Sequence, residues 1–135
     1  MALRESELRY KLLAENVSDV IWTVDIGLRF TYLSPSVEKL LGYQVEHLLG
    51  QSVIEFLVPE SQRLVAQKNA RLKEKLKTYG NRPFDLESLE IKMIRQDGLE
   101  IWTEIQNSFF LNDFREVAGI IGVARDITKR KEYEG

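Results

Sequence analysis

Three segments of alternating apolar and polar residues fill the last third of the chain, and they constrain the fold most. Residues 89–94 read LEIKMI and are followed by Asp97-Gly98, a dipeptide typical of two-residue hairpin turns. LEIWTEIQNSFFL at 99–111 and VAGIIGVARDI at 117–127 continue the pattern after short interruptions. Because strands joined by short turns pair antiparallel, this part of the chain predicts an antiparallel meander.

Two further strands and a series of helices are predicted before this meander. DVIWTVD at 19–25 and LRFTYLS at 28–34 are rich in β-branched and aromatic residues and flank a turn at Gly27. Short helical segments follow, and a longer helix is predicted from Pro59 to about Thr78. The order predicts an α+β fold, with a five-stranded antiparallel sheet that carries the short helices and the longer helix on one face.

The two ends of the chain predict accessory helices. Leu8, Leu12 and Leu13 form a narrow apolar stripe, typical of an amphipathic helix that rests on another surface. The last residues, KRKEYEG, are fewer than the roughly 12 to 15 that an isolated helix needs, so we expect the chain to continue in a longer protein. The expected parts are an N-terminal helix over 1–17, a compact domain over 18–128 and the start of a C-terminal helix over 129–135.

Composition narrows the classes of function. The 135 residues include no cysteine and one histidine, His47, which excludes disulfides and disfavours both a catalytic triad and a His-rich metal site. Basic and acidic residues number 19 and 21, without long blocks, which disfavours nucleic acid as a partner. The sequence offers no catalytic cluster, so we expect a non-catalytic domain. It has neither a signal sequence nor a long apolar run, so we expect a cytoplasmic location without membrane contact.

Five segments in order resemble those of a PAS domain over Leu8 to Arg130: ENVSDVIWTVD, YLSPSVEKLLGY, HLLGQSVIEFLVPES, RQDGLEIWTEI and GIIGVARDITKRK. The resemblance implies a sensor or interaction module of a longer signalling protein, with a cavity between the sheet and its helices. In similar domains an Asp-Ile-Thr triplet, here Asp126 to Thr128, begins a linker helix to an output domain, often a histidine kinase or a cyclic-dinucleotide enzyme. Asp126 or Thr128 is suited to cap that helix.

The same resemblance bears on cofactors. Haem-binding PAS domains usually supply an axial histidine from the long helix, which has none here, and His47 on QVEHLL is expected to face water. Flavin photochemistry of the LOV type needs a cysteine, which this chain lacks. Haem and a LOV-type flavin are therefore disfavoured, and the sequence indicates no other cofactor.

Candidate cavity residues come from the long helix and the sheet. Lys68 and Asn69 fall within the apolar arc of the long helix, so they either meet a polar ligand or reach solvent at its edge. On the strands, alternation and the positions that face the cavity in similar domains select a larger set, most of which would also serve as core. It comprises Trp22, Val24, Tyr32, Ile91, Met93, Thr103, Ile105, Asn107, Ile120, Gly122 and Ala124.

Trp102 falls on the opposite face of the sheet, beside Glu104 and Gln106. A large aromatic side chain on a polar face predicts that another surface packs on it. This surface is either the N-terminal helix, through Leu8 and Leu12, or a second subunit in a homodimer. Two functions remain open: a sensory domain that binds a small metabolite and signals through its C-terminal helix, or a ligand-free dimerisation and protein-interaction module.

Overall fold

The computed structural model describes residues 18–134. The predicted helix over 1–17, with Leu8 and Leu12, lies outside the described residues. The elements, in order, are β1 (Val20–Val24), β2 (Phe30–Leu33), α2 (Val37–Leu41), α3 (Val45–Leu48), the 3-10 helix η1 (Val53–Phe56), α4 (Pro59–Thr78), β3 (Leu89–Ile94), β4 (Glu100–Leu111), β5 (Val117–Asp126) and α5 (Thr128–Glu134).

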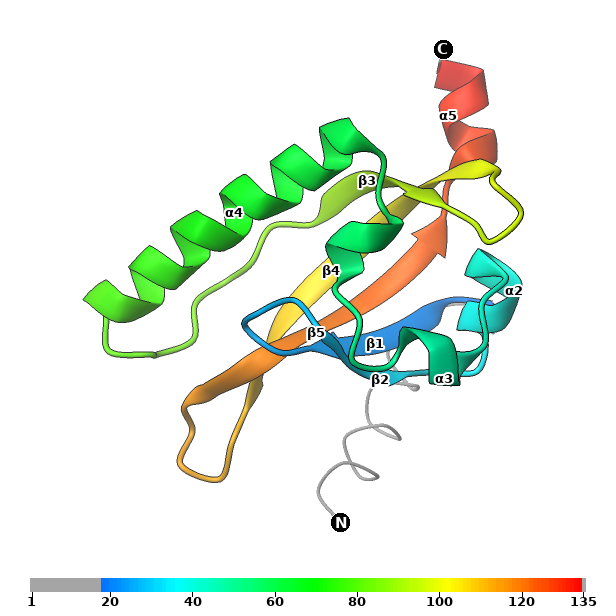
Figure 1. The fold of residues 1–135 in the computed structure, drawn as a ribbon. Helices are drawn as coiled ribbons and strands as arrows, with labels where there is room; N and C mark the ends of the chain where they lie inside the picture. Colours follow the sequence, from blue (N-terminus) through cyan, green and yellow to red (C-terminus); the bar gives the residue numbers. More distant parts are fainter. Residues whose placement is uncertain (1–17, 135) are drawn as a thin grey trace.

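The strands form one five-stranded sheet in the order β2-β1-β5-β4-β3, with every neighbouring pair antiparallel. The predicted meander is β3-β4-β5, and the N-terminal hairpin joins it through β1, where Trp22 pairs with Gly122. Helices α2, α3, η1 and α4 lie on the same side of the sheet, which we call the inner face (Figure 1). The predicted fold class is therefore confirmed.

Helix α4 begins and ends at the predicted residues. Pro59 occupies its first turn, where a missing backbone N–H leaves no helical hydrogen bond unmade. Of its 20 residues only Ser61, Val65 and Leu76 are buried. The longest helix therefore covers the sheet loosely.

The tightest packing lies under the short helices. Side chains from the strands and from these helices reach full burial there; the largest are Phe30, Leu41, Leu48, Leu57, Met93, Val20, Val37 and Thr103. Trp22 meets Phe30 edge to face, with ring centroids 5.4 Å apart. We call this part of the inner face the closed end.

Candidate functional site

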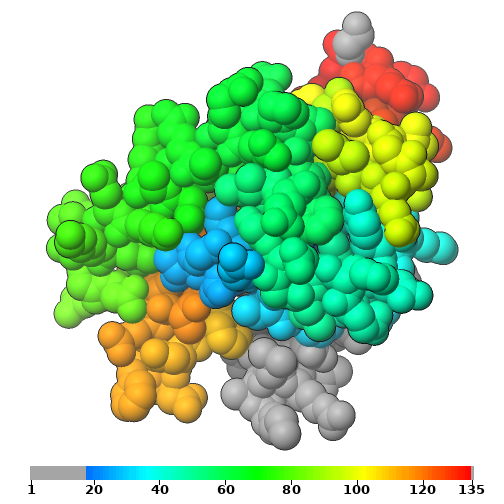
Figure 2. Space-filling view, in the orientation of Figure 1, coloured from blue at the N-terminus to red at the C-terminus, as the bar shows by residue number. Residues whose placement is uncertain are grey.

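A cavity of about 310 Å³ lies between the inner face, α4 and the segment that joins α4 to β3. We call residues 82–88 of that segment the strap; they have no helix or strand of their own. The β1–β2 turn (blue in Figure 2) lies between α4 and η1 and contributes Leu28 to the wall. The volume is at the lower end of the roughly 300 to 1,000 Å³ typical of small-molecule sites.

The structure brings most of the predicted cavity residues together. The predicted residues that line the cavity are Trp22, Val24, Lys68, Asn69, Ile91, Ile105, Asn107 and Ile120. The remaining wall was not predicted and includes Arg71, Leu72 and Lys75 on α4 and Phe84, Asp85, Leu86 and Glu87 on the strap. In the sequence, Phe84 and Leu86 alternate in the parity opposite to Leu89, Ile91 and Met93, and this change of parity is a signal for the strap. A ligand role for all these residues stays a prediction.

Four predicted residues face inward but belong to the packed core. Met93 is fully buried and its strand position bridges to Leu57. Thr103 is also fully buried, and its hydroxyl donates to the carbonyl of Ile91 at 3.0 Å. At Gly122 an added Cβ would lie 2.7 Å from Trp22 Nε1, so the indole already fills the space beside this glycine. Ala124, 1% exposed, is likewise core.

The predicted inward orientation of Tyr32 is wrong. Tyr32 pairs with Thr23, whereas the inward-facing Trp22 pairs with Leu33. A bulge shifts the register between Thr23 and Val24, so that Phe30 and Leu33 both face the core although they are three positions apart. Simple alternation from Phe30 therefore assigns Tyr32 to the wrong face.

Lys68 spans the mouth of the cavity. Its Nζ lies 2.6 Å from Glu87 Oε2 on the strap, and its side chain is 39% exposed. The hydrogen bond from Lys68, together with its charge, holds the pKa of Glu87 below its ordinary value. Lys68 thus lines the cavity and also reaches solvent, and a contact with a polar ligand stays a prediction.

Asn69 has one satisfied and one unsatisfied polar atom. Its amide Nδ2 donates to the carbonyl oxygen of Ile26 in the β1–β2 turn at 3.2 Å. Its Oδ1 is buried and has no hydrogen-bond partner among the described residues. A buried acceptor without a donor costs about 1 to 3 kcal/mol, so a molecule that donates to Asn69 recovers free energy.

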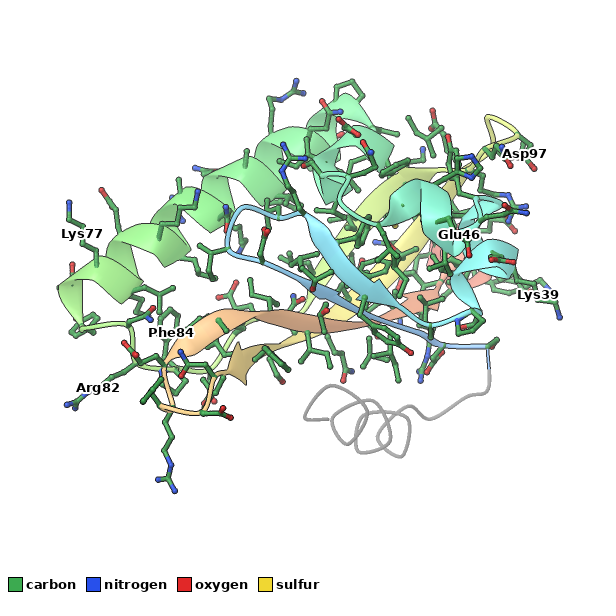
Figure 3. All side chains as sticks on the ribbon, turned by 60° about the horizontal axis from the view of Figure 1, so that its bottom comes forward. Lys39, Glu46, Lys77, Arg82, Phe84 and Asp97 are labelled. Carbon is green, nitrogen blue, oxygen red and sulfur yellow. The ribbon has the colours of Figure 1, made fainter. Side chains whose placement is uncertain are left out.

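The strap is held by side chains rather than by a sheet ladder. Asn107 Nδ2 donates to the carbonyl of Glu87 at 3.3 Å, and Phe84 meets Phe109 edge to face at 5.0 Å. Lys75 Nζ lies 4.4 Å from the centre of the Phe84 ring. Figure 3 shows Phe84 between the C-terminal part of α4 and strands β4 and β5, whereas Arg82 points outward.

His47 is exposed, as expected. Within residues 18–134 no three His, Cys, Asp or Glu side chains lie close enough together to hold a metal ion. No helix in this part of the chain has the length and apolar character needed to cross a membrane.

The predicted junction residues lie where β5 becomes α5. Asp126 Oδ1 accepts the backbone N–H of Thr128 at 2.8 Å, which satisfies an amide at the start of the helix. Thr128 Oγ1 accepts the backbone N–H of Trp102 at 3.0 Å, and the Ile127 N–H donates to the Trp102 carbonyl. Strand β4 and the first residues of α5 are thus joined directly.

Helix α5 continues to Glu134. Arg130 pairs with Glu90 and Glu104, and Lys131 pairs with Glu90, so ion pairs fasten the helix to β3 and β4. Lys131 Nζ also lies 4.9 Å from the centre of the Trp102 ring. Cations from within the chain thus lie over Trp102, and a role for this residue in dimerisation or in docking the N-terminal helix stays a prediction.

An inner-face cavity and a C-terminal helix on the other side of the sheet define a domain of the sensory type. The family model of the PAS fold matches residues 8–127, and the chain belongs to the PAS family. The crystal structure of a PAS domain from Colwellia psychrerythraea is 25% identical, covers 92% of this chain and 98% of its own, and superposes with a TM-score of 0.68.

Two curated relatives are named as sensors. The chain is 29% identical to the sensor histidine kinase TmoS of Ectopseudomonas mendocina, over 99% of this chain and 13% of that protein. It is 28% identical to the methyl sulfide methyltransferase-associated sensor of Methanosarcina acetivorans, over 98% of this chain and 12% of that protein. The chain therefore spans only a small part of these two relatives.

Proposed function

We propose that the chain is the sensory PAS domain of a larger signalling protein, that it binds a small molecule in the cavity under α4, and that it relays binding through α5 to an output domain. The observation that carries the proposal is the cavity itself, mostly apolar, with the unpaired Oδ1 of Asn69 in its wall. Buried polar groups are normally hydrogen-bonded, so this oxygen favours a ligand that brings a donor.

Alternation along the strands supports the relay. Ile91 and Ile105 line the cavity, and their chain neighbours Glu90 and Glu104 hold α5 on the opposite face. Because adjacent strand residues point to opposite faces, a ligand that displaces Ile91 or Ile105 also displaces an anchor of α5. The cavity and the output helix are thus separated by one layer of backbone.

The sensor histidine kinase among the relatives makes a kinase the first candidate for the output domain. The PAS domain itself would then be non-catalytic, and the phosphoryl transfer would belong to another part of the longer protein. Assembly as a homodimer through the face of Trp102 is compatible with this arrangement, and so is a cytoplasmic location.

Native mass spectrometry of freshly purified protein tests the binding step. We expect a small molecule to co-purify, and an Ile120→Trp variant, which fills the cavity, to lose it. A bare mass in wild-type protein, with unchanged signalling by Ile120→Trp in the full-length chain, would instead support the ligand-free interaction module.

Asp126→Ala tests the relay. Loss of one exposed cap costs only about 0.5 to 2 kcal/mol, so we expect a folded domain and altered output from the full-length protein. Unchanged output from this variant would reduce Asp126 to an ordinary helix cap.

A further inference from the structure

The charges at the cavity mouth are unevenly divided between its two rims. Helix α4 presents Lys68, Arg71 and Lys75 to the cavity, and the spacing of three and four residues places them along one side of the helix. The strap presents Asp85 and Glu87. The mouth therefore carries three cations against two carboxylates, and the cations belong to the more rigid element.

Among residues 18–134, only one of these cations has a carboxylate partner. Lys68 pairs with Glu87, and Lys75 lies over the Phe84 ring. The Arg71 guanidinium makes no ion pair or hydrogen bond within residues 18–134. Below this charged rim the wall is apolar, with Val65, Leu72 and Ile120. The site thus combines an apolar interior with an excess of positive charge at its entrance.

Lys68 and Asn69 reach opposite walls of the cavity. Lys68 extends to the strap, whereas Asn69 turns toward Ile26 in the β1–β2 turn. An anionic group at Lys68 therefore does not have to face the unpaired oxygen of Asn69. The carboxylate of Glu87 already occupies the position on Lys68 that an incoming anion would take.

From this geometry we infer that the cavity selects a small molecule whose apolar body carries one carboxylate and, on the opposite side, a hydrogen-bond donor for Asn69 Oδ1. The carboxylate displaces Glu87 from Lys68, with Arg71 beside it. This inference rests on the proposed function. It also gives a consequence for the strap, because residues 82–88 make no backbone-to-backbone hydrogen bond with the described chain. Without the Lys68–Glu87 pair, the strap is held by Asn107, by the ring contacts of Phe84 and by the packing of Leu86 against the core.

Three probes that share one apolar body test the charge preference: phenylacetate, 2-phenylethanol and 2-phenylethylamine. Each is titrated into the ¹⁵N-labelled 135-residue chain, with the amide shifts of Ile105 and Ile120 as the report of cavity binding. A partly exposed ion pair contributes about 0.2 to 1 kcal/mol. On Lys68 the ligand replaces one carboxylate by another, so the net gain in the wild type comes from Arg71, and we expect phenylacetate to bind up to about fivefold more tightly than the alcohol. The amine should bind most weakly, and added salt should narrow the differences.

Two variants test the competing carboxylate of Glu87 and the cation of Lys68 separately. Glu87→Gln removes the competing carboxylate, so phenylacetate should bind about two- to fivefold more tightly while the alcohol is unaffected. Lys68→Met keeps the apolar stem and should remove most of the preference for phenylacetate over the alcohol. Glu74→Gln and Lys73→Met are the matched controls, because both residues are exposed on α4 and neither lines the cavity.

The outcomes distinguish this inference from the proposed function. Equal binding of phenylacetate and 2-phenylethanol, in wild type and in Glu87→Gln, would overturn the anionic preference and leave a ligand-binding cavity in place. A neutral or cationic molecule found by native mass spectrometry would do the same. Absence of binding by all three probes, together with a bare native mass, would overturn both.

Discussion

The two ends of the inner face differ in how completely they are covered. At the closed end, under α2, α3 and η1, Met93 and Thr103 have no exposed surface. Two to four residues further along β4, Ile105 and Asn107 border the cavity under α4 and the strap, which we call the open end. Thr103, Ile105 and Asn107 follow one another on the same face of one strand.

The covering element accounts for this difference. In α2, a helix of five residues, Val37, Leu40 and Leu41 are all buried. In α4, Lys68 and Asn69 take positions on the side that faces the sheet, where apolar side chains would have filled the space. Strand alternation decides which residues face inward, and the helix above them decides whether they pack as core or line a cavity.

Truncation of a buried side chain should give the largest difference in stability between the closed end and the open end. Met93→Ala opens a hole in the closed end and should lower the free energy of unfolding by about 2 to 5 kcal/mol. Ile120→Ala, at the cavity wall, should cost at least about 1 kcal/mol less, because part of its surroundings is already empty. Urea denaturation of both variants measures the difference, and equal losses would show that the open end is packed as tightly as the closed end.

Enlarging a side chain by one methylene should change the free energy of unfolding in opposite directions at the closed end and the open end. Val37→Ile adds a methylene where no side-chain surface is exposed and should destabilise by about 1 to 3 kcal/mol. Val65→Ile adds the same group at the cavity wall and should stabilise by up to about 0.8 kcal/mol. Thermal and urea midpoints report both changes, and a loss of stability in Val65→Ile would contradict the open end as described.

The fold followed from local sequence signals, but fewer than half of the residues that line the cavity were predicted. Period-two strands, the Asp97-Gly98 turn and Pro59 at the start of α4 are readable without tertiary information. Ile91, Ile105, Asn107 and the α4 pair Lys68 and Asn69 were predicted because each lies inside a regular element, where its face is fixed by the period.

The wrong and missing predictions concern residues at which the regular alternation of side chains is interrupted or absent. The bulge opposite Thr23 reverses the face of Tyr32, and nothing in the sequence of β2 announces it. The strap depends on contacts between distant residues, such as Phe84 with Phe109 and Lys75 with Phe84. The ion pairs of Arg130 and Lys131 with Glu90 likewise require the sheet order, which the sequence does not state.

Gly122→Ala probes the boundary between the two ends. Its new Cβ would lie 2.7 Å from Trp22 Nε1, and Trp22 also lines the cavity. Since the indole has space to move into, we expect a cost of about 1 kcal/mol, at the low end of overpacking, with a reduced affinity for phenylacetate. A large loss of stability with unchanged affinity would place Trp22 in the closed end alone.

The smallest expected effect concerns α5, on the far side of the sheet from the cavity. The pKa of Glu90 is lowered, first by its hydrogen bond from Lys131, and the same bond raises the pKa of Lys131. A lowered carboxyl pKa gives stability that is full above the ordinary value of about 4.3 and is lost as the pH falls through the lowered value. For Lys131 the contribution is full below about pH 10.4 and is lost as the pH rises through the raised pKa.

Helix α5 should therefore stay fastened at neutral pH and loosen in acid before the sheet unfolds. Amide chemical shifts of residues 128–134 against pH measure this loosening, with the β5 amides as an internal reference for the intact sheet. Glu90→Gln removes the carboxylate that pairs with Arg130 and Lys131, so α5 should be looser at neutral pH and lose most of its acid transition. Glu132→Gln, an exposed neighbour on the same helix, should leave the transition in place. An acid transition of wild-type size in Glu90→Gln would show that β3 does not hold α5, and any path from the cavity to α5 would then have to run through Trp102 on β4 and its contact with Thr128 on α5.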